Sequence, residues 1–186
     1  MNATLTVNNV SAGIDGFGLL SAIVANLPDA PAFAPIYREL AKHQSTSVRA
    51  EVADKCNLDD ETALLVLNDD SRQVIFNAIG GFGENKNAKK VITEAIISRL
   101  LDKNSLNITG RIVLNANSFP LVSPDYIYDR VKNNPDPDFR DLLASTSDVP
   151  RSVKRRLEND ADLSVSMTAK GNNTIYNYWG GGNVPF

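Results

Sequence analysis

The sequence predicts an all-α protein built as an α-solenoid of short helical pairs. Residues 134–172 contain one unit nearly twice, because a turn rich in Asn, Asp and Pro leads into a short apolar run at both Phe139 and Val165. These two residues are 26 positions apart, and Val48 and Val74 repeat that spacing in another part of the chain. A fixed period of this length is typical of a repeat array, in which each unit buries its apolar face against its neighbours.

The length and composition fit one domain. The chain has 186 residues, of which 42% are hydrophobic and 22% are charged, as in ordinary globular domains. We expect a single helical-repeat domain over residues 1–186. Within it, residues 1–16 are an N-terminal cap or arm, residues 17–172 are the repeats, and residues 173–186 form an aromatic, Gly-rich tail.

The N-terminal part predicts two helices after a less regular segment. Residues 1–16 alternate weakly between apolar and polar side chains and fit a short strand as well as a cap or a frayed arm. Residues 19–27 have apolar side chains at helical spacing until Pro28 ends the run, and residues 36–42 show a second helical pattern.

Three short helices are expected within residues 45–79. A cluster of Ser and Thr residues can cap the first of them, and an Asp-Asp-Ser turn can cap the third. The second helix is expected over residues 61–67, with Leu64 and Leu67 facing the core. Gly80 follows the third helix and is a typical helix terminator.

The second half of the chain repeats this pattern with more variation. Residues 80–90 are expected to form a loop, and residues 88–101 carry the longest helical pattern of the sequence. Residues 126–132 predict another helix. A short amphipathic run at residues 152–157 links the two copies of the unit described first.

Three segments resemble the leucine-rich repeat variant family, a branch of the HEAT-like helical repeats. They are SVRAEVA at residues 47–53, VPRSV at residues 149–153, and the segment that begins DLSV at residues 162–172. The resemblance covers residues 17–172 and implies an α-solenoid superhelix and no particular activity. The units are longer than is usual for the family, so we expect two helices per repeat. Some members carry an iron–sulfur cluster in a cysteine-rich N-terminal segment, but Cys56 is the single cysteine here, so no cluster is implied.

The charge balance limits the classes of partner. The net charge is −3, so the chain has no global positive field and binding to nucleic acid is disfavoured. No segment approaches the roughly 18 consecutive apolar residues that a membrane-spanning helix needs. The N-terminus lacks the basic start and apolar run of a signal peptide. We expect a cytoplasmic protein.

Few residues suit catalysis or metal binding. The single histidine, His43, lies in a polar turn and is expected to be solvated, and Cys56 is expected to be a small core residue. The Gly-rich segment at residues 80–86 lacks the Gly-Lys-Ser/Thr ending of a phosphate-binding loop. We therefore expect no catalytic residues, no cofactor and no metal, and a protein that is not an enzyme.

Pairs of acidic residues recur along the chain at predicted helix starts. There, carboxylates cap backbone amides and interact favourably with the helix dipole, which explains a periodic recurrence that a single active site would not. The pairs are Asp59/Asp60, Asp69/Asp70, Asp136/Asp138 and Asp160/Asp162. We expect them to be structural.

The densest basic cluster follows Pro150. Val153 and Leu157 are four residues apart and are expected to face the core, which leaves Arg151, Lys154 and Arg155 on the outer face. A solvated surface balanced by nearby acids is the ordinary interpretation of such a cluster. It is also the best candidate for a partner-binding surface.

The aromatic tail is the second candidate. Tyr176 and Trp179 are expected to cover the last exposed apolar stripe of the repeat array, since terminal units need a cap. The alternative is a segment that docks onto a partner or onto a second copy of the chain.

The leading functional prediction is a non-enzymatic scaffold or inhibitor that binds another protein. A more specific expectation is a bacterial regulatory or immunity-type protein whose acidic surface engages a basic partner. Two alternatives stay open. One is a nucleic-acid-binding helical repeat that uses Arg151, Lys154 and Arg155, and the other is a structural module that oligomerises through its C-terminal tail.

Overall fold

Short helices make up most of the regular structure. The computed structural model describes residues 2–7, 10–80 and 87–171. One set of helices comprises α1 (Gly16–Asn26), α3 (Thr46–Ala53), α5 (Arg72–Ile79), α7 (Leu106–Leu114), α9 (Pro137–Ser145) and α11 (Leu163–Ala169). The other comprises α2 (Ala34–Leu40), α4 (Asp60–Leu67), α6 (Glu94–Leu101), α8 (Pro124–Lys132) and α10 (Arg151–Arg155). Three 3₁₀ turns lie at Pro31–Phe33, Asn87–Val91 and Ala116–Ser118.

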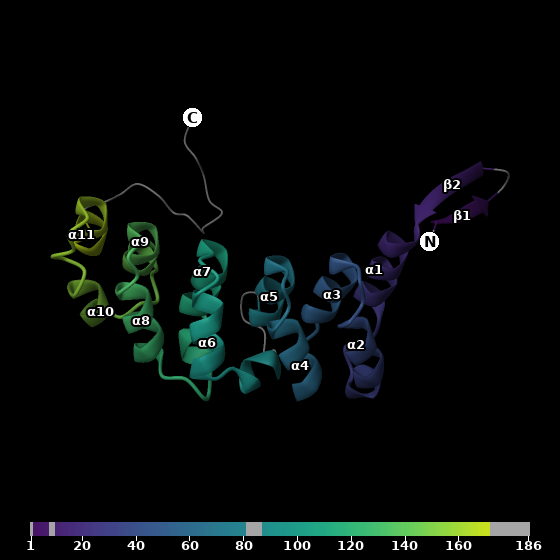
Figure 1. Ribbon diagram of the computed structural model, residues 1–186, viewed down its shortest axis with the longest axis horizontal. Coiled ribbons are helices and arrows are strands. Elements are labelled where there is room, and N and C mark those ends of the chain that lie inside the picture. Colours follow the sequence, from purple (N-terminus) through teal and green to yellow (C-terminus); the bar gives the residue numbers. More distant parts are fainter. Residues whose placement is uncertain (1, 8–9, 81–86, 172–186) are drawn as a thin grey trace.

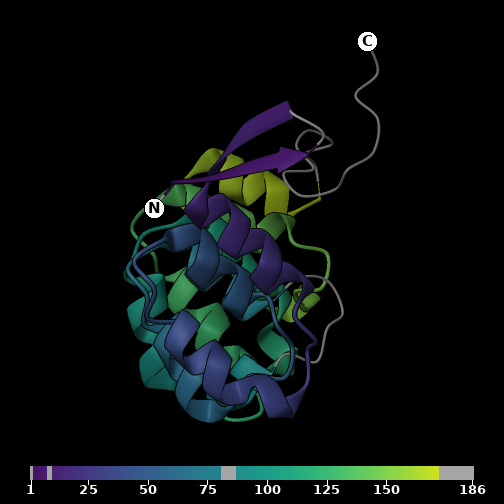
Figure 2. The same cartoon turned by 90° about the vertical axis from the view of Figure 1, so that its right-hand side faces the viewer.

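The two sets form two rows (Figure 1). In the first row, α1, α3, α5, α7, α9 and α11 follow one another, and each packs on the next. The second row, α2 to α10, lies along one side of the first, and α4, α6 and α8 pack against first-row helices. Viewed along the rows, the helices lie one behind another (Figure 2). The predicted helical class is confirmed.

The core lies between the rows and is built from equivalent positions. The third residue of each first-row helix from α3 onward is at most 4% exposed, and these residues are Val48, Val74, Ile108, Phe139 and Val165. The two pairs with the 26-residue spacing therefore occupy the same place in their helices. Burial of one apolar side chain per helix at this position contributes about 2 kcal/mol each relative to an exposed side chain.

The N-terminal segment forms a hairpin. Strand β1 (Asn2–Val7) pairs antiparallel with strand β2 (Val10–Asp15), from Asn2 opposite Asp15 to Val7 opposite Val10. The hairpin leads directly into α1 and projects from that end of the rows (Figure 1). Of the three forms expected for this segment, the strand is the one observed.

The prediction of a continuous helix over residues 88–101 is wrong. The segment begins as the 3₁₀ turn Asn87–Val91, and α6 starts only at Glu94. Thr93 separates the two, because its extended backbone and its hydroxyl, which accepts a hydrogen bond from the Ile96 amide at 3.4 Å, start a new helix. The 3₁₀ turn packs on α4 and so extends the second row between α4 and α6.

The prediction that Leu64 faces the core is also wrong. Leu64 is 38% exposed, whereas Ala63, Val66 and Leu67 are fully buried. The buried residues follow the three- and four-residue spacing of one helix face, and Leu64 lies one position off that face. The prediction for Leu67 is confirmed.

The described helices are short compared with the length that is needed to span a membrane. The longest helix in the described part of the chain, α1, has 11 residues. None of the described helices is long and apolar enough to cross a membrane.

Candidate functional site

A buried ion pair ties α3 to the turn before α5. The Arg49 guanidinium donates to both carboxylate oxygens of Asp69, from Nε at 2.6 Å and from Nη2 at 3.1 Å. Its remaining nitrogen, Nη1, donates to the carbonyls of His43 and Gln44 at 2.8 and 3.0 Å. Asp69 also accepts from the Ser71 amide at 2.7 Å, which forms an Asx turn before the helix. One arginine thus joins two consecutive turns.

The same arrangement recurs at the other end of the rows. Arg140 donates to both carboxylate oxygens of Asp160, from Nε at 2.8 Å and from Nη2 at 3.0 Å. Its Nη1 donates to the carbonyls of Asn134 and Pro135 at 2.7 and 2.9 Å. Asp160 accepts from the Asp162 amide at 2.9 Å. Every bond of the first site has its counterpart here.

Both sites are shielded from water. The side chains of Arg49 and Asp69 are 17% and 7% exposed, and those of Arg140 and Asp160 are 14% and 9% exposed. The hydrogen bond from Arg140 holds the pKa of Asp160 below its ordinary value, and the same bond raises the pKa of Arg140. Two-point contact between a planar guanidinium and a carboxylate also fixes orientation. These pairs therefore set the relative positions of neighbouring helices.

The two helices between these sites lack the arginine. Arg49 and Arg140 are the fourth residues of α3 and α9, and the fourth residues of α5 and α7 are Ile75 and Thr109. Ile75 is fully buried, so its position belongs to the apolar core. Thr109 is 1% exposed, and its hydroxyl oxygen has no hydrogen-bond partner among the described residues.

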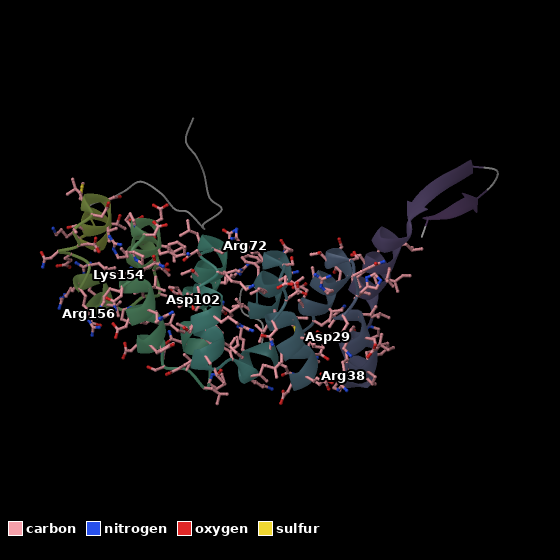
Figure 3. The ribbon with its side chains drawn as sticks, in the orientation of Figure 1. Asp29, Arg38, Arg72, Asp102, Lys154 and Arg156 are labelled. Carbon is pink, nitrogen blue, oxygen red and sulfur yellow. The ribbon has the colours of Figure 1, made fainter. Side chains whose placement is uncertain are left out.

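A groove opens beside Thr109, and we call it the Thr109 groove. It has a volume of about 510 Å³, and its lining residues come from α6, α7, α8 and the turns that follow α6 and α8. Asp102, which lies on the α8 side of the α6/α7 pair in Figure 3, is one of the lining residues. The groove is lined by Leu101, Asp102, Asn104, Thr109, Tyr126, Asp129, Arg130, Val131, Asn133, Asn134 and Pro135. This volume falls in the range of small-ligand sites.

Arg130 lies at the rim of the Thr109 groove. Its Nη2 donates to the Ser98 hydroxyl and to an Asp102 carboxylate oxygen, each at 3.0 Å. Asp129, also on the rim, accepts from Lys132 at 3.2 Å and from Arg156 at 3.1 Å. The rim therefore already presents carboxylates to cations.

A second groove, the α9 groove, lies on the first row. Its volume is about 410 Å³, and its lining residues come from the N-terminal parts of α7 and α11 and from α9: Leu106, Asn107, Pro137, Asp138, Asp141, Leu142, Ser145, Asp162, Ser164 and Val165. The Oδ1 atom of Asp141 is buried and has no hydrogen-bond partner in the described part of the chain. The groove thus combines apolar walls with an unsatisfied carboxylate oxygen.

The predicted basic cluster lies at the α10 end (Figure 3). Arg151 is exposed, donates to the Ala169 carbonyl and binds Glu158 at 2.7 Å. Lys154 is half-buried rather than fully outward, and burial lowers its pKa, with a further lowering from the charge of Arg151. Arg155 is exposed. The structure brings these residues onto one short helix but not to either groove.

The packing residues predicted for this cluster are confirmed. Val153 and Leu157 are 3% and 1% exposed. Tyr176 and Trp179 lie outside the described residues, so their expected cap or docking role stays a prediction.

Two of the residues considered for chemistry have structural contacts. The His43 Nδ1 accepts from the Ser45 amide at 3.0 Å, the same turn contact that Asp69 makes in the next unit, so the expected solvated residue is instead half-buried. Cys56 is half-buried rather than a core residue, and its amide donates to Asp29 at 2.6 Å. No cluster of three or more His, Cys, Asp or Glu side chains in residues 2–7, 10–80 and 87–171 could hold a metal ion.

The acidic pairs are confirmed as turn and cap residues at several positions. Asp59 caps α4 by accepting from the Thr62 amide at 2.8 Å. Asp136 and Asp162 accept from amides at the starts of α9 and α11. Asp59 also accepts from Arg38 at 2.5 Å, whereas Asp69 and Asp160 each contact their arginine through both carboxylate oxygens.

Sequence reasoning missed these arginine–aspartate pairs and both grooves. One signal was available for the pairs, since Asp69 follows Arg49 by 20 residues and Asp160 follows Arg140 by the same number. The grooves had no such signal, because their walls come from three or four separate helices and turns.

Comparison with known proteins adds no relative. No family model, no curated protein and no solved structure matches the chain. What the chain does must therefore be inferred from its own grooves and surfaces.

Proposed function

We propose that this chain is an α-solenoid of the HEAT-like, leucine-rich repeat variant type that binds another protein and catalyses no reaction. The α9 groove is its main contact surface, and the partner segment that it receives carries both apolar and cationic side chains. The observation that carries the proposal is the buried, unsatisfied carboxylate oxygen of Asp141 in a largely apolar groove.

The chemistry of the α9 groove selects this kind of segment. Leu106 is 36% exposed and provides apolar contact, Leu142 and Val165 line the groove but are almost completely buried, and Asp138 and Asp141 provide negative charge. A carboxylate oxygen that is buried without a partner costs free energy, and a Lys or Arg side chain that reaches it recovers that cost. A few side chains in desolvated pockets near the centre of a protein interface contribute most of its binding free energy, and arginine is common among them.

Exposed apolar side chains near the groove extend the surface. Leu163 is 73% exposed and Met167 is 37% exposed, both on α11, while Leu106 on α7 is 36% exposed. Large apolar side chains that cluster on a surface often mark an interaction site. A partner that covers α7, α9 and α11 would bury all three.

The repeated geometry supports the solenoid part of the proposal. Each first-row helix from α3 onward buries an apolar residue at its third position, and α3 and α9 carry matching arginine sites at their fourth position. Repeat arrays of this kind present extended surfaces, which suits a scaffold or an inhibitor. The cytoplasmic regulatory or immunity-type role in a bacterium follows from the same reasoning and stays a prediction.

Charge pairing at the α10 end favours a protein partner over nucleic acid. Arg151 is paired with Glu158, and Arg156 is paired with Asp129, both in the cluster's immediate surroundings. Cations that already contact carboxylates release fewer counterions from a phosphate backbone. The absence of binding to duplex DNA or RNA in a gel-shift assay at low salt would agree with this preference.

The proposal is tested by site-specific photo-crosslinking in source cells. A photoreactive amino acid placed at Asn107 or Ser145 in the α9 groove is expected to capture one protein, whereas the same amino acid at Ser123, outside the groove, is the matched control. The captured protein is then purified and titrated against the wild type and Asp141→Asn. We expect Asp141→Asn to weaken binding by about tenfold or more.

Two outcomes would contradict the proposal. If positions 107 and 145 capture no more protein than position 123, the groove does not contact a partner. If the purified partner binds Asp141→Asn as tightly as the wild type, the carboxylate is not part of the interface.

A further inference from the structure

We infer that the Thr109 groove is a receptor for an arginine side chain supplied by the partner protein. The inference rests on the proposed function, in which the partner is a protein with cationic side chains. It names a second contact point, distinct from the α9 groove, and the chemical group that this point recognises.

The chain itself shows how a guanidinium is held at this position. In the two closed sites, a guanidinium on the fourth residue of a first-row helix contacts two carbonyls of the preceding turn. It also contacts a side chain in the turn before the next first-row helix. This side chain belongs to the residue two positions before the N-cap of that helix, as Asp160 is two positions before Asp162. Arg140, for example, joins the carbonyls of Asn134 and Pro135 to the carboxylate of Asp160.

Some of the equivalent positions lie at the Thr109 groove, where the fourth residue of the first-row helix is a threonine instead of an arginine. The equivalent turn positions are Lys103, whose carbonyl accepts from Arg72 at 3.5 Å, and Asn104, whose φ is +47°, and the residue two positions before the N-cap of α9 is Asn134. Asn134 Oδ1 accepts from the Asp136 amide at 2.9 Å, the turn contact that Asp160 makes with Asp162. Asn104, Thr109 and Asn134 all line the groove.

Thr109 leaves this space open because its side chain is short. An arginine here would extend toward Asn134, as Arg140 extends toward Asp160, but a threonine ends after its hydroxyl and methyl groups. The groove of about 510 Å³ lies where that longer side chain would run. The Thr109 hydroxyl oxygen is itself buried and has no hydrogen-bond partner among the described residues.

The rim carries two carboxylates, and each of them already contacts cations: Asp102 binds Arg130, and Asp129 binds Lys132 and Arg156. Asn134 adds an amide oxygen in place of the carboxylate found in the closed sites. Arg130 repels an incoming cation, but its own bond to Asp102 shows that this rim holds a guanidinium. A single arginine should therefore bind weakly, and the rest of the partner supplies additional affinity.

The test uses three short peptides on the full chain. They are acetyl-Gly-Arg-Gly-amide and its lysine and citrulline counterparts, titrated into isotope-labelled protein and followed by NMR. We expect the arginine peptide to shift the Asn104 and Asn134 resonances with a dissociation constant of about 1 mM. Citrulline has the same shape without the charge, and we expect its binding to be weaker by about tenfold.

A variant that binds more tightly keeps the test informative, because a misfolded protein would not show stronger binding. Asn134→Asp restores the carboxylate of the closed sites, and we expect it to bind the arginine peptide about tenfold more tightly. Thr109→Arg combined with Asn134→Asp places an internal guanidinium in the groove, and we expect this double variant to lose the peptide-induced shifts.

Several results would overturn the inference. These are the absence of shifts at about 10 mM arginine peptide, equal shifts from citrulline, and no gain in Asn134→Asp. Partner binding separates this failure from failure of the proposed function. If the captured partner binds the double variant as tightly as the wild type, the scaffold stands and the arginine receptor does not.

Discussion

The four junctions between consecutive first-row helices from α3 to α11 fall into two kinds. The first and last junctions are each locked by an arginine that joins two turns, Arg49 to Asp69 and Arg140 to Asp160. The two in the middle place Ile75 in the core and Thr109 beside an open groove. One backbone position thus accepts an internal cation, an apolar side chain or a short side chain that leaves space for a ligand.

Unit length explains part of this difference. The locked junctions belong to the two units with the 26-residue spacing, from Val48 to Val74 and from Phe139 to Val165. The middle units are longer, with 34 residues from Val74 to Ile108 and 31 residues from Ile108 to Phe139. Extra residues in these units include the 3₁₀ turns Asn87–Val91 and Ala116–Ser118. The turn before α7 has Lys103 where the locked junctions have Asp, and an ammonium group cannot accept an arginine hydrogen bond.

The sharpest test of the comparison moves an arginine into the apolar junction. Ile75→Arg would bury a guanidinium with no acid at the following turn, and we expect it to lower the free energy of unfolding by about 4 kcal/mol or more. Urea denaturation measures the loss. Ile75→Leu is the control and should cost less than about 1.5 kcal/mol. If both variants unfold at similar urea concentrations, the position is not part of a dry core.

Removing an existing arginine should have the next largest effect. Arg140→Ala leaves Asp160 buried without its partner, and we expect a loss of about 3 kcal/mol in the free energy of unfolding. Arg155→Ala, on an exposed side chain of α10, is the control and should leave that free energy nearly unchanged. A double-mutant cycle with Asp160→Ala measures the coupling between the two groups. A coupling near zero would mean that the pair does not stabilise the junction.

Closing the open junction should have a smaller effect of opposite sign. Thr109→Arg with Asn134→Asp recreates the locked arrangement, and we expect it to raise the free energy of unfolding by about 1 kcal/mol. The measurement compares the urea midpoint of the double variant with that of Asn134→Asp alone. If the double variant is instead destabilised as strongly as Ile75→Arg, the Thr109 groove does not match the space that Arg140 occupies.

The smallest effect is expected from pH. The pKa of Asp160 is lowered in the folded chain by its hydrogen bond from Arg140, so its contribution to stability is complete above the unfolded pKa of about 3.9. That contribution is lost as the pH falls through the lower, folded pKa. Asp160→Asn should therefore show a shallower loss of stability than the wild type below about pH 4. Parallel curves for the two proteins would contradict the assignment.

The sequence was sufficient to predict the helical class and the equivalence of Val48 with Val74 and of Phe139 with Val165, because periodic apolar residues and caps are local signals. It was not sufficient for the break at Thr93, since the apolar spacing continues through it while the backbone does not. Leu64 was misplaced because two faces of a short helix carry similar apolar content. The grooves depend on side chains from separate turns, such as Asn104 and Asn134, whose proximity no local pattern encodes.

The row arrangement has a mechanical consequence. The main contacts of a first-row helix are with the helices beside it, so any bending force passes through every junction in series. We expect the series to be stiffer where Arg49 and Arg140 clamp it than around Thr109. Two rigid blocks would then pivot about a soft centre, and a side chain wedged into that centre would set the curvature of the whole array.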